Sequence, residues 1–115
     1  MTQYLIAFYD PPGIPEAELS EAARDGAALV REARAAGVWV FGGGLRDPGG
    51  AAVVAPDGAV TDGPFPESKE LLAGFGVVDV PSREAALKWA EKIAVACRCP
   101  QEVREFLPDP TIEEK

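Results

Sequence analysis

The order of the apolar segments constrains the fold of this chain more than any single motif does. Tyr4–Tyr9 is apolar on both faces and runs into a Pro-Pro-Gly turn, which indicates a strand covered on both sides. A helix is expected from about residue 15 or 16 to residue 36, because small apolar residues recur there at helical spacing and Gly37 follows as a stop. Val38–Leu45 is expected to form the second strand.

The expected first helix and second strand both contain small residues at positions where they would pack against other elements. The apolar stripe of the expected helix consists mostly of alanine and glycine, so we expect the helix to lie close to a sheet. Trp39 and Phe41 are expected on the same face of the second strand, since side chains alternate along a strand. The strand ends in the glycines 42–44, for which two interpretations stay open: a bulge or close backbone crossing, and backbone approach to a ligand.

The second half of the chain predicts a hairpin, a long strand, a helix and a last strand. Residues 51–55 and 59–60 flank the turn Pro56–Gly58. Leu71–Val80 is expected to be a strand whose glycines 74 and 76 need something packed against the backbone. Ser82 is a candidate N-cap of a helix that Pro100 ends, and Glu102–Leu107 is the last expected strand.

This order predicts an α+β, ferredoxin-like split β-α-β fold, with two helices on one face of an antiparallel sheet. The other face would still carry large apolar groups, so we expect a homodimer in which two sheets pack face to face around a two-fold axis. Residues 1–107 are expected to form one domain, and residues 108–115 an acidic, proline-containing tail.

Charge and composition exclude several classes of function. A net charge of −8 and a pI near 4.5 argue against nucleic-acid binding and against an anionic membrane surface. No apolar run approaches the length of a membrane span and no leader is recognisable, so we expect a cytoplasmic protein. The chain has no histidine, which excludes a Ser-His-Asp triad, a Cys-His dyad and an imidazole proton shuttle.

No cofactor or metal motif is visible in the sequence. Cys97 and Cys99 are too close for an unstrained disulfide, and two cysteines without histidine do not make a zinc site. We expect both cysteines to be incidental, and neither a cofactor nor a bound metal.

The segment Thr61–Phe65, Thr-Asp-Gly-Pro-Phe, is the best candidate for a site. Asp62 is the candidate catalytic carboxylate, which would act as a general base if it were desolvated. The alternative is a structural role, in which its side chain accepts backbone N–H bonds of its own turn. Lys69 follows among Glu67 and Glu70 and is a candidate to hold an anionic ligand.

Three further polar residues stand near expected strand ends and are candidate ligand-binding residues. They are Tyr9 at the end of the first strand, Arg46 after the glycines, and Arg104 on the last strand. For Arg104 the alternative is a salt bridge with a neighbouring glutamate. The large aromatic residues are instead expected in the core or the dimer interface: Trp39, Phe41, Phe75 and Trp89.

Residues along nearly the whole chain resemble the YCII-related superfamily, in particular its DGPF-containing branch. The matching residues are Tyr4–Ile6, Ala35–Val38, Gly42–Leu45, Thr61–Phe65 with Glu67, Lys69 and Glu70, Gly74–Phe75, Glu84–Ala85, Trp89–Ala90 and Glu102–Arg104. The resemblance implies a dimeric α+β barrel built from two ferredoxin-like protomers. Some relatives carry a His-Asp pair proposed as a catalytic dyad, which this chain cannot form.

Two functions from different classes are left open. One is a small-molecule enzyme or binding protein with a pocket near the Thr61–Phe65 turn. This pocket would lie between the sheet and the helices or at the dimer interface, with Asp62 and Lys69 at its edge. The other is a non-catalytic interaction module linked to transcriptional regulation, because members of the family often occur beside alternative sigma factors.

Overall fold

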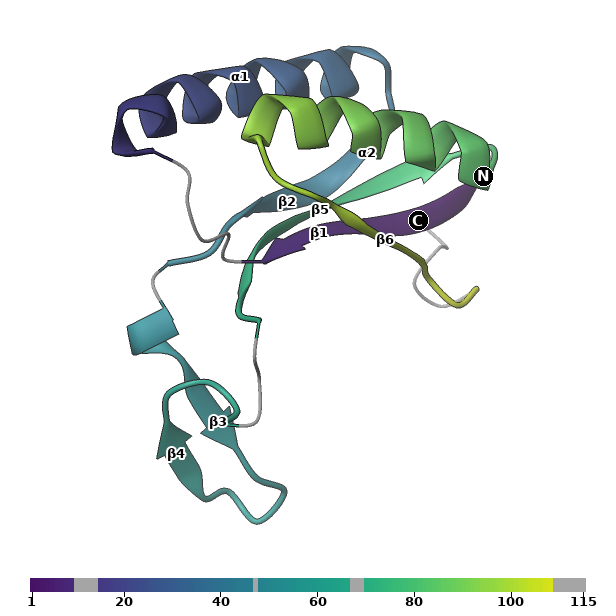
Figure 1. Ribbon diagram of the computed structural model, residues 1–115. Helices are drawn as coiled ribbons and strands as arrows, with labels where there is room; N and C mark the ends of the chain where they lie inside the picture. Colours follow the sequence, from purple (N-terminus) through teal and green to yellow (C-terminus); the bar gives the residue numbers. More distant parts are fainter. Residues whose placement is uncertain (10–14, 47, 67–69, 109–115) are drawn as a thin grey trace.

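A four-stranded antiparallel sheet forms the centre of the molecule, and two helices cover one of its faces (Figure 1). The computed structural model describes residues 1–9, 15–46, 48–66 and 70–108. The elements in chain order are β1 (Thr2–Tyr9), α1 (Glu16–Ala35), β2 (Trp39–Gly44), a 3₁₀ turn (Pro48–Gly50), β3 (Ala52–Val54), β4 (Val60–Asp62), β5 (Leu72–Val80), α2 (Arg83–Cys97) and β6 (Glu102–Glu105).

The strand order confirms the predicted α+β, ferredoxin-like fold. The sheet has the order β2-β5-β1-β6, and each neighbouring pair is antiparallel. Because β5 lies between β1 and β2, the unit β1-α1-β2 is a split β-α-β unit. The face of the sheet opposite the helices is called the open face below.

Local signals in the sequence account for the ends of both helices. Gly37, just after α1, adopts a φ of 76°, a conformation that glycine tolerates best. Ser82 caps α2, since its Oγ accepts a hydrogen bond of 3.1 Å from the backbone N–H of Ala85. The helix was expected to end at Pro100, but it ends at Cys97. The reason is that Arg98 adopts the left-handed conformation, with a φ of 59°.

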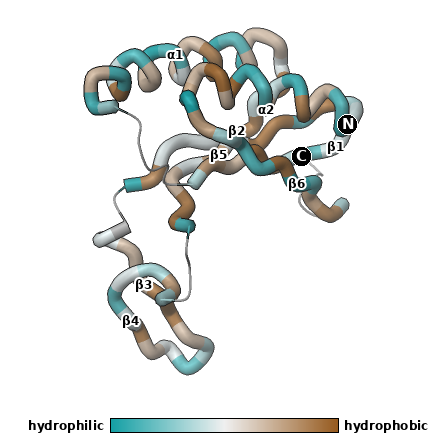
Figure 2. Tube along the Cα trace, in the orientation of Figure 1, coloured by the Kyte–Doolittle hydropathy of each residue, from teal (hydrophilic) through white to brown (hydrophobic). Residues whose placement is uncertain are grey.

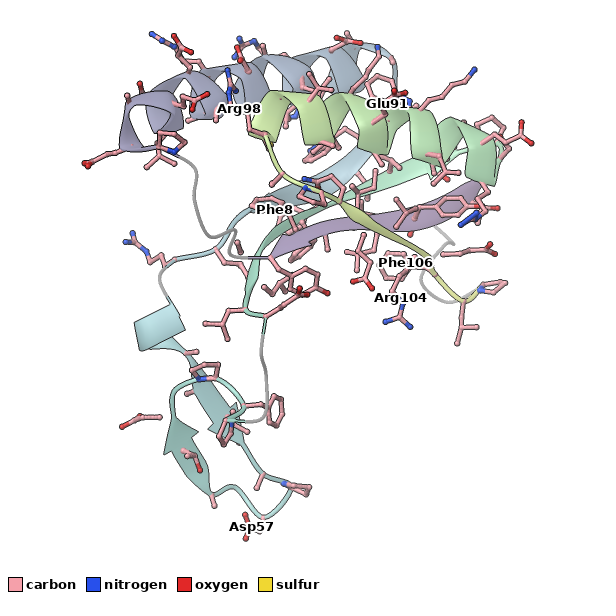
Figure 3. All side chains as sticks on the ribbon, viewed as in Figure 1. Phe8, Asp57, Glu91, Arg98, Arg104 and Phe106 are labelled. Atoms are coloured by element: carbon pink, nitrogen blue, oxygen red, sulfur yellow. The ribbon has the colours of Figure 1, made fainter. Side chains whose placement is uncertain are left out.

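The side chain of Arg98 joins the two helices (Figure 3). Its guanidinium lies beside three carboxylates of α1, at 3.7 Å from Glu18, 3.7 Å from Glu21 and 3.2 Å from Asp25. These carboxylates are largely exposed, so each pair contributes less than about 1 kcal/mol. One cation that bridges three anions nevertheless fixes the end of α2 against the first half of α1.

Apolar residues gather along the central strands, and α1 shows hydrophilic residues on its outer turns (Figure 2). The buried core lies between the sheet and α2 and consists of Tyr4, Ile6, Val78, Val80, Ala86 and Ala90. In the part of the chain that the structure describes, no helix is long and apolar enough to cross a membrane.

The ring of Trp39 lies on the backbone of two glycines. A Cβ atom at Gly76 would lie 2.7 Å from both Cη2 and Cζ3 of Trp39, and one at Gly42 would lie 2.9 Å from Cη2. In the same way, a Cβ at Gly74 would lie 2.6 Å from the ring of Phe8. Gly74 and Gly76 therefore make room for aromatic rings of the same chain. Gly42 also makes room for the backbone of β5, because its Cβ would overlap the Phe75 carbonyl oxygen.

A β-bulge changes the predicted faces of β2. Trp39 pairs with Val78 and Phe41 pairs with Val77, so the register shifts between them. Adjacent residues of β5 point to opposite faces, and Val78 belongs to the core under the helices. Trp39 therefore faces the helices and Phe41 lies on the open face, and the prediction that they share a face was wrong.

The hairpin of β3 and β4 projects away from the sheet (Figure 1). At its tip, Asp57 accepts a hydrogen bond of 2.8 Å from the N–H of Ala59, and Gly58 has a φ of 91°. The Cα radius of gyration is 15.7 Å, against roughly 13 Å for a compact domain of about this length. The hairpin is therefore an arm outside the compact body.

The contact between Trp39 and Gly76 predicts a sharp difference between two glycine substitutions. Gly76→Ala should cost about 1–3 kcal/mol of unfolding free energy, because its methyl group would overlap the Trp39 ring. Gly43→Ala is the matched control in the neighbouring strand, where an added Cβ meets no atom within 4 Å. Urea unfolding measures both, and equal stability of the two variants would contradict this packing.

Candidate functional site

A cavity of about 250 Å³ lies between the helix layer and the sheet. It is lined by Ile6 and Phe8 of β1, by Gly26, Ala27, Leu29, Val30 and Ala33 of α1, by Trp39, Gly43 and Gly44 of β2, by Phe75, Gly76 and Val78 of β5, by Trp89, Ile93 and Cys97 of α2, and by Gln101. The α1 side of this lining is the small-residue stripe. Side chains this short leave space under the helix, whereas we had expected close contact with the sheet.

The cavity lining carries no charged side chain among the described residues. Its polar side chains are those of Cys97 and Gln101. Both cysteines are free, as expected, and burial raises the pKa of the Cys97 thiol, so the thiol stays neutral at physiological pH. The described part of the chain also holds no cluster of three or more cysteine and acidic side chains able to bind a metal. The chemistry of this cavity is that of an apolar binding site.

Asp62 lies outside this cavity, at the end of β4 on the projecting arm. It pairs with Ala52 across the hairpin and is exposed. No described residue donates a hydrogen bond to its carboxylate, and the backbone bond of the turn runs from Gly63 N–H to the Ala51 carbonyl, at 2.7 Å. The side-chain turn role considered for Asp62 is played at the hairpin tip by Asp57.

Tyr9 and Arg104 come together on the open face. The phenol of Tyr9 donates a hydrogen bond of 2.6 Å to Oε1 of Glu102. The pKa of Tyr9 is raised, mainly by this hydrogen bond and then by burial and by the charges of Glu102 and Glu70. The charge of Arg104 lowers it. Arg104 points away from the helices (Figure 3) and makes no ion pair with any described residue. The pairing of β1 with β6 thus brings Tyr9, Glu102 and Arg104 together in a polar cluster, which no short sequence motif predicts.

Arg46 lines a second, shallower hollow at the base of the arm. This hollow has a volume of about 420 Å³, and its lining also includes Leu45, Gly50, Ala51, Pro64, Leu71 and Leu72. Pro64 belongs to the Thr61–Phe65 turn, so Arg46 is the candidate residue that the structure places beside that turn. Lys69 and Glu67 lie outside the described residues.

The comparison with protein families decides the assignment of the chain. The model of the YCII-related domain matches residues 2–106. The chain belongs to the YCII-related domain family. No curated protein matches the chain.

The match to the YCII-related domain covers the sheet, both helices and the arm, so the cavity lies within the family domain. A pocket between the sheet and the helices was one of the two positions expected for a binding site, but Asp62 does not lie at its edge, and Gln101 was not singled out. Trp39 and Trp89 were expected in the core or the dimer interface, and they are half-buried beside the cavity. The sequence feature that could have indicated the cavity is the run of small residues on α1, which is compatible both with close packing and with a cavity.

The hydrogen bond between Tyr9 and Glu102 predicts how the two tyrosines of this YCII-related domain titrate. Glu102→Gln should lower the pKa of Tyr9 toward the ordinary value, because the neutral phenol loses a carboxylate acceptor. The raised pKa also means that this bond stabilises the fold below the ordinary tyrosine pKa and that this stabilisation is lost as pH rises through the raised value.

The matched control is Glu105→Gln. The pKa of Tyr4 is raised by burial and then by Glu105, so this variant should shift Tyr4 and leave Tyr9 unchanged. NMR titration of the tyrosine Cζ resonances resolves the two phenols. An unchanged Tyr9 titration in Glu102→Gln would show that the hydrogen bond does not form in solution.

Proposed function

We propose that this YCII-related domain is a cytoplasmic homodimer that binds a small, uncharged, largely apolar molecule in the cavity between its helices and sheet. The observation that carries the proposal is the cavity itself, about 250 Å³ in volume and lined almost wholly by apolar side chains. The apolar side chains that line this space lack packing contacts on the side that faces it. A bound apolar molecule would restore those contacts.

The volume indicates the size of the ligand. An apolar cavity of about 150 Å³ stays dry and binds benzene, so 250 Å³ suits a molecule with one or two rings. Aromatic side chains from both layers surround the space, since Phe8 and Trp39 come from the sheet and Trp89 from α2. Flat aromatic molecules would stack or pack edge-to-face against them.

Binding, rather than proton transfer, is what this cavity supports. The described lining offers no carboxylate, ammonium or guanidinium group, and the chain has no histidine. General acid–base catalysis needs a titratable group within hydrogen-bond reach of the reacting atom. The thiol of Cys97 does not meet this need, because burial raises its pKa and keeps it protonated.

The open face supports the homodimer. Phe41 is 65% exposed there, and its ring lies 6.4 Å from that of Phe75 between centroids. Phe106 is 44% exposed and projects from the same face (Figure 3). Large apolar side chains exposed on one face of a sheet mark an interaction surface more often than a free one, and a second copy of the chain would cover this face by two-fold symmetry.

A second candidate site for the ligand is the hollow at the base of the arm. Arg46 makes no ion pair with any described residue and lies in a hollow shared with Pro64 of the turn. An anionic molecule would suit that position, and Asp62 would lie on the same arm. This candidate and the cavity make different predictions for the same set of variants.

The cavity site predicts that Gly26→Leu abolishes binding. The leucine would extend from α1 into the cavity, and it should also raise stability, since glycine costs about 1 kcal/mol in a helix interior. Gly26→Ala is the matched control: its methyl group meets Cys97 Sγ at an ordinary 3.6 Å and leaves most of the space open. Toluene serves as the probe, and tryptophan fluorescence reports binding because both tryptophans of the chain line the cavity.

A saturable change should appear in wild type, Gly26→Ala and Asp62→Asn, and should vanish in Gly26→Leu. If no apolar probe changes the fluorescence or melting temperature of the wild type, the cavity is not a binding site. If a thermal-shift screen instead finds an anionic ligand whose effect is lost in Arg46→Ala or Asp62→Asn, the site lies at the arm.

The homodimer predicts a mass of twice the 12.1 kDa chain in light scattering coupled to size-exclusion chromatography. Phe41→Glu should give a folded monomer, because a carboxylate would be buried unpaired in the interface. Val95→Glu is the control, since Val95 is 73% exposed on α2, on the other side of the sheet. A monomeric wild type would rule out the dimer.

A further inference from the structure

The arm presents an apolar face that no other described helix or strand covers. Val54 and Val60 pair across the hairpin, so their side chains lie on the same side of it, together with that of Ala52. Val54 is 66% exposed and Val60 is 64% exposed. Among the described elements, β3 and β4 pack extensively only against each other. The side formed by Ala52, Val54 and Val60 is called the arm face below.

A hairpin of this kind needs further contacts. Two strands isolated in water are marginally stable, and stability takes a third strand or packing against another element. The described sheet of β3 and β4 has only these two strands, so the outer edge of each leaves backbone N–H and C=O groups without a strand partner. We therefore expect the arm face to be covered in the assembled protein.

The arm lies on the same side of the sheet as the open face (Figure 3). Arg104 and Phe106 project from the sheet away from the helices, toward the side on which the arm and its tip at Asp57 lie. The open face and the arm thus form two sides of one corner.

The two surfaces are continuous at the base of the arm. Leu72 pairs with Tyr9, whose hydroxyl bonds to Glu102 on the open face. Leu72 also lines the hollow at the base of the arm, together with Leu45 and with Pro64 of the turn. Both leucines are exposed. A molecule that covers the open face would therefore lie next to the arm.

A second copy of the chain fits this corner in size and in symmetry. Two sheets that pack face to face lie about 10 Å apart. The hairpin runs for about 17 Å from Ala52 to its turn at Asp57, at about 3.4 Å per residue, so an arm that leaves one sheet reaches past a second sheet packed on it. A two-fold interface uses the same patch on both subunits, so each copy would give one arm and receive one. Both arm faces would then be covered in a closed dimer.

We propose that each arm packs its face, Ala52, Val54 and Val60, against the second copy of the chain. This inference rests on the proposed function, because it names a further contact of the same homodimer. It gives the hairpin a role in assembly that is separate from the contact of Phe41 on the open face.

Two neighbouring residues of β4 provide a matched pair of substitutions. Val60 belongs to the arm face, whereas Thr61 is exposed on the other side of the hairpin. Val60→Asp should raise the dissociation constant of the dimer on the order of tenfold or more, because a carboxylate would be buried without a partner. Thr61→Asp should change it by no more than about twofold, as a surface substitution outside an interface does. Sedimentation equilibrium measures both constants.

The monomeric variant Phe41→Glu shows whether Val60 acts between chains. Adding Val60→Asp to it should leave the melting temperature nearly unchanged, because Val60 is exposed within its own chain. A clear fall in the melting temperature would show that Val60 packs inside the protomer, and would contradict the proposal.

NMR of a mixed dimer observes the contact directly and needs no variant. Half of the chains carry ¹³C-labelled valine methyl groups and the other half are unlabelled, so filtered NOEs report only contacts between chains. The methyl groups of Val54 and Val60 should show such NOEs. Those of Val95, on the outer side of the helix layer, should show none.

The outcomes separate this inference from the homodimer on which it rests. If the wild type is a dimer in which no NOE between chains reaches Val54 or Val60, or if Val60→Asp and Thr61→Asp weaken it equally, the arm does not pack on the second copy although the dimer exists. An assembly larger than a dimer that Val60→Asp reduces to a dimer would also overturn the inference, because the arms would then join dimers to one another. A monomeric wild type in light scattering would overturn both the homodimer and the role of the arm.

Discussion

The contact between the Trp39 ring and the glycine backbone of β2 and β5 determines much of this structure. The ring occupies space that side chains at Gly42 and Gly76 would need, and it packs against the core under the helices. Trp39 belongs to β2, and its position on Gly76 therefore helps to define which residues of β2 and β5 face each other. The bulge after Trp39 then turns Phe41 to the open face. The Trp39 ring thus influences the strand register, the packing under the helices and the position of the exposed Phe41.

The cavity follows from how large and small side chains are distributed between the two layers. Trp39 and Phe8 on the sheet and Trp89 on α2 are large, while α1 opposes them mostly with small side chains, those of Gly26, Ala27, Val30 and Ala33, beside Leu29. Bulky residues at those α1 positions would fill the space. Arg98 links α1 and α2 through exposed carboxylates, outside the apolar layer.

Much of the fold could be predicted from the sequence because its signals are local. The helix stop at Gly37, the cap at Ser82 and the turn at Gly58 each depend on a few neighbouring residues. The face of Phe41 could not be predicted, because a bulge depends on pairing with a distant strand. The candidate site was harder still: the bond between Tyr9 and Glu102 joins residues 93 positions apart, and only the register of β1 and β6 brings them together.

The cavity and the open face lie on opposite sides of one sheet and share a strand. Along β5, Gly76 and Val78 face the cavity, whereas Phe75 and Val77 place their side chains on the other side. A substitution in β5 therefore alters both surfaces, and its effect on ligand binding or on association could not be assigned to one of them. Gly26 lies on α1, in the helix layer, and Phe41 is not among the residues that line the cavity. Substitutions at these positions separate ligand binding from dimerisation, which a change in the shared strand could not do.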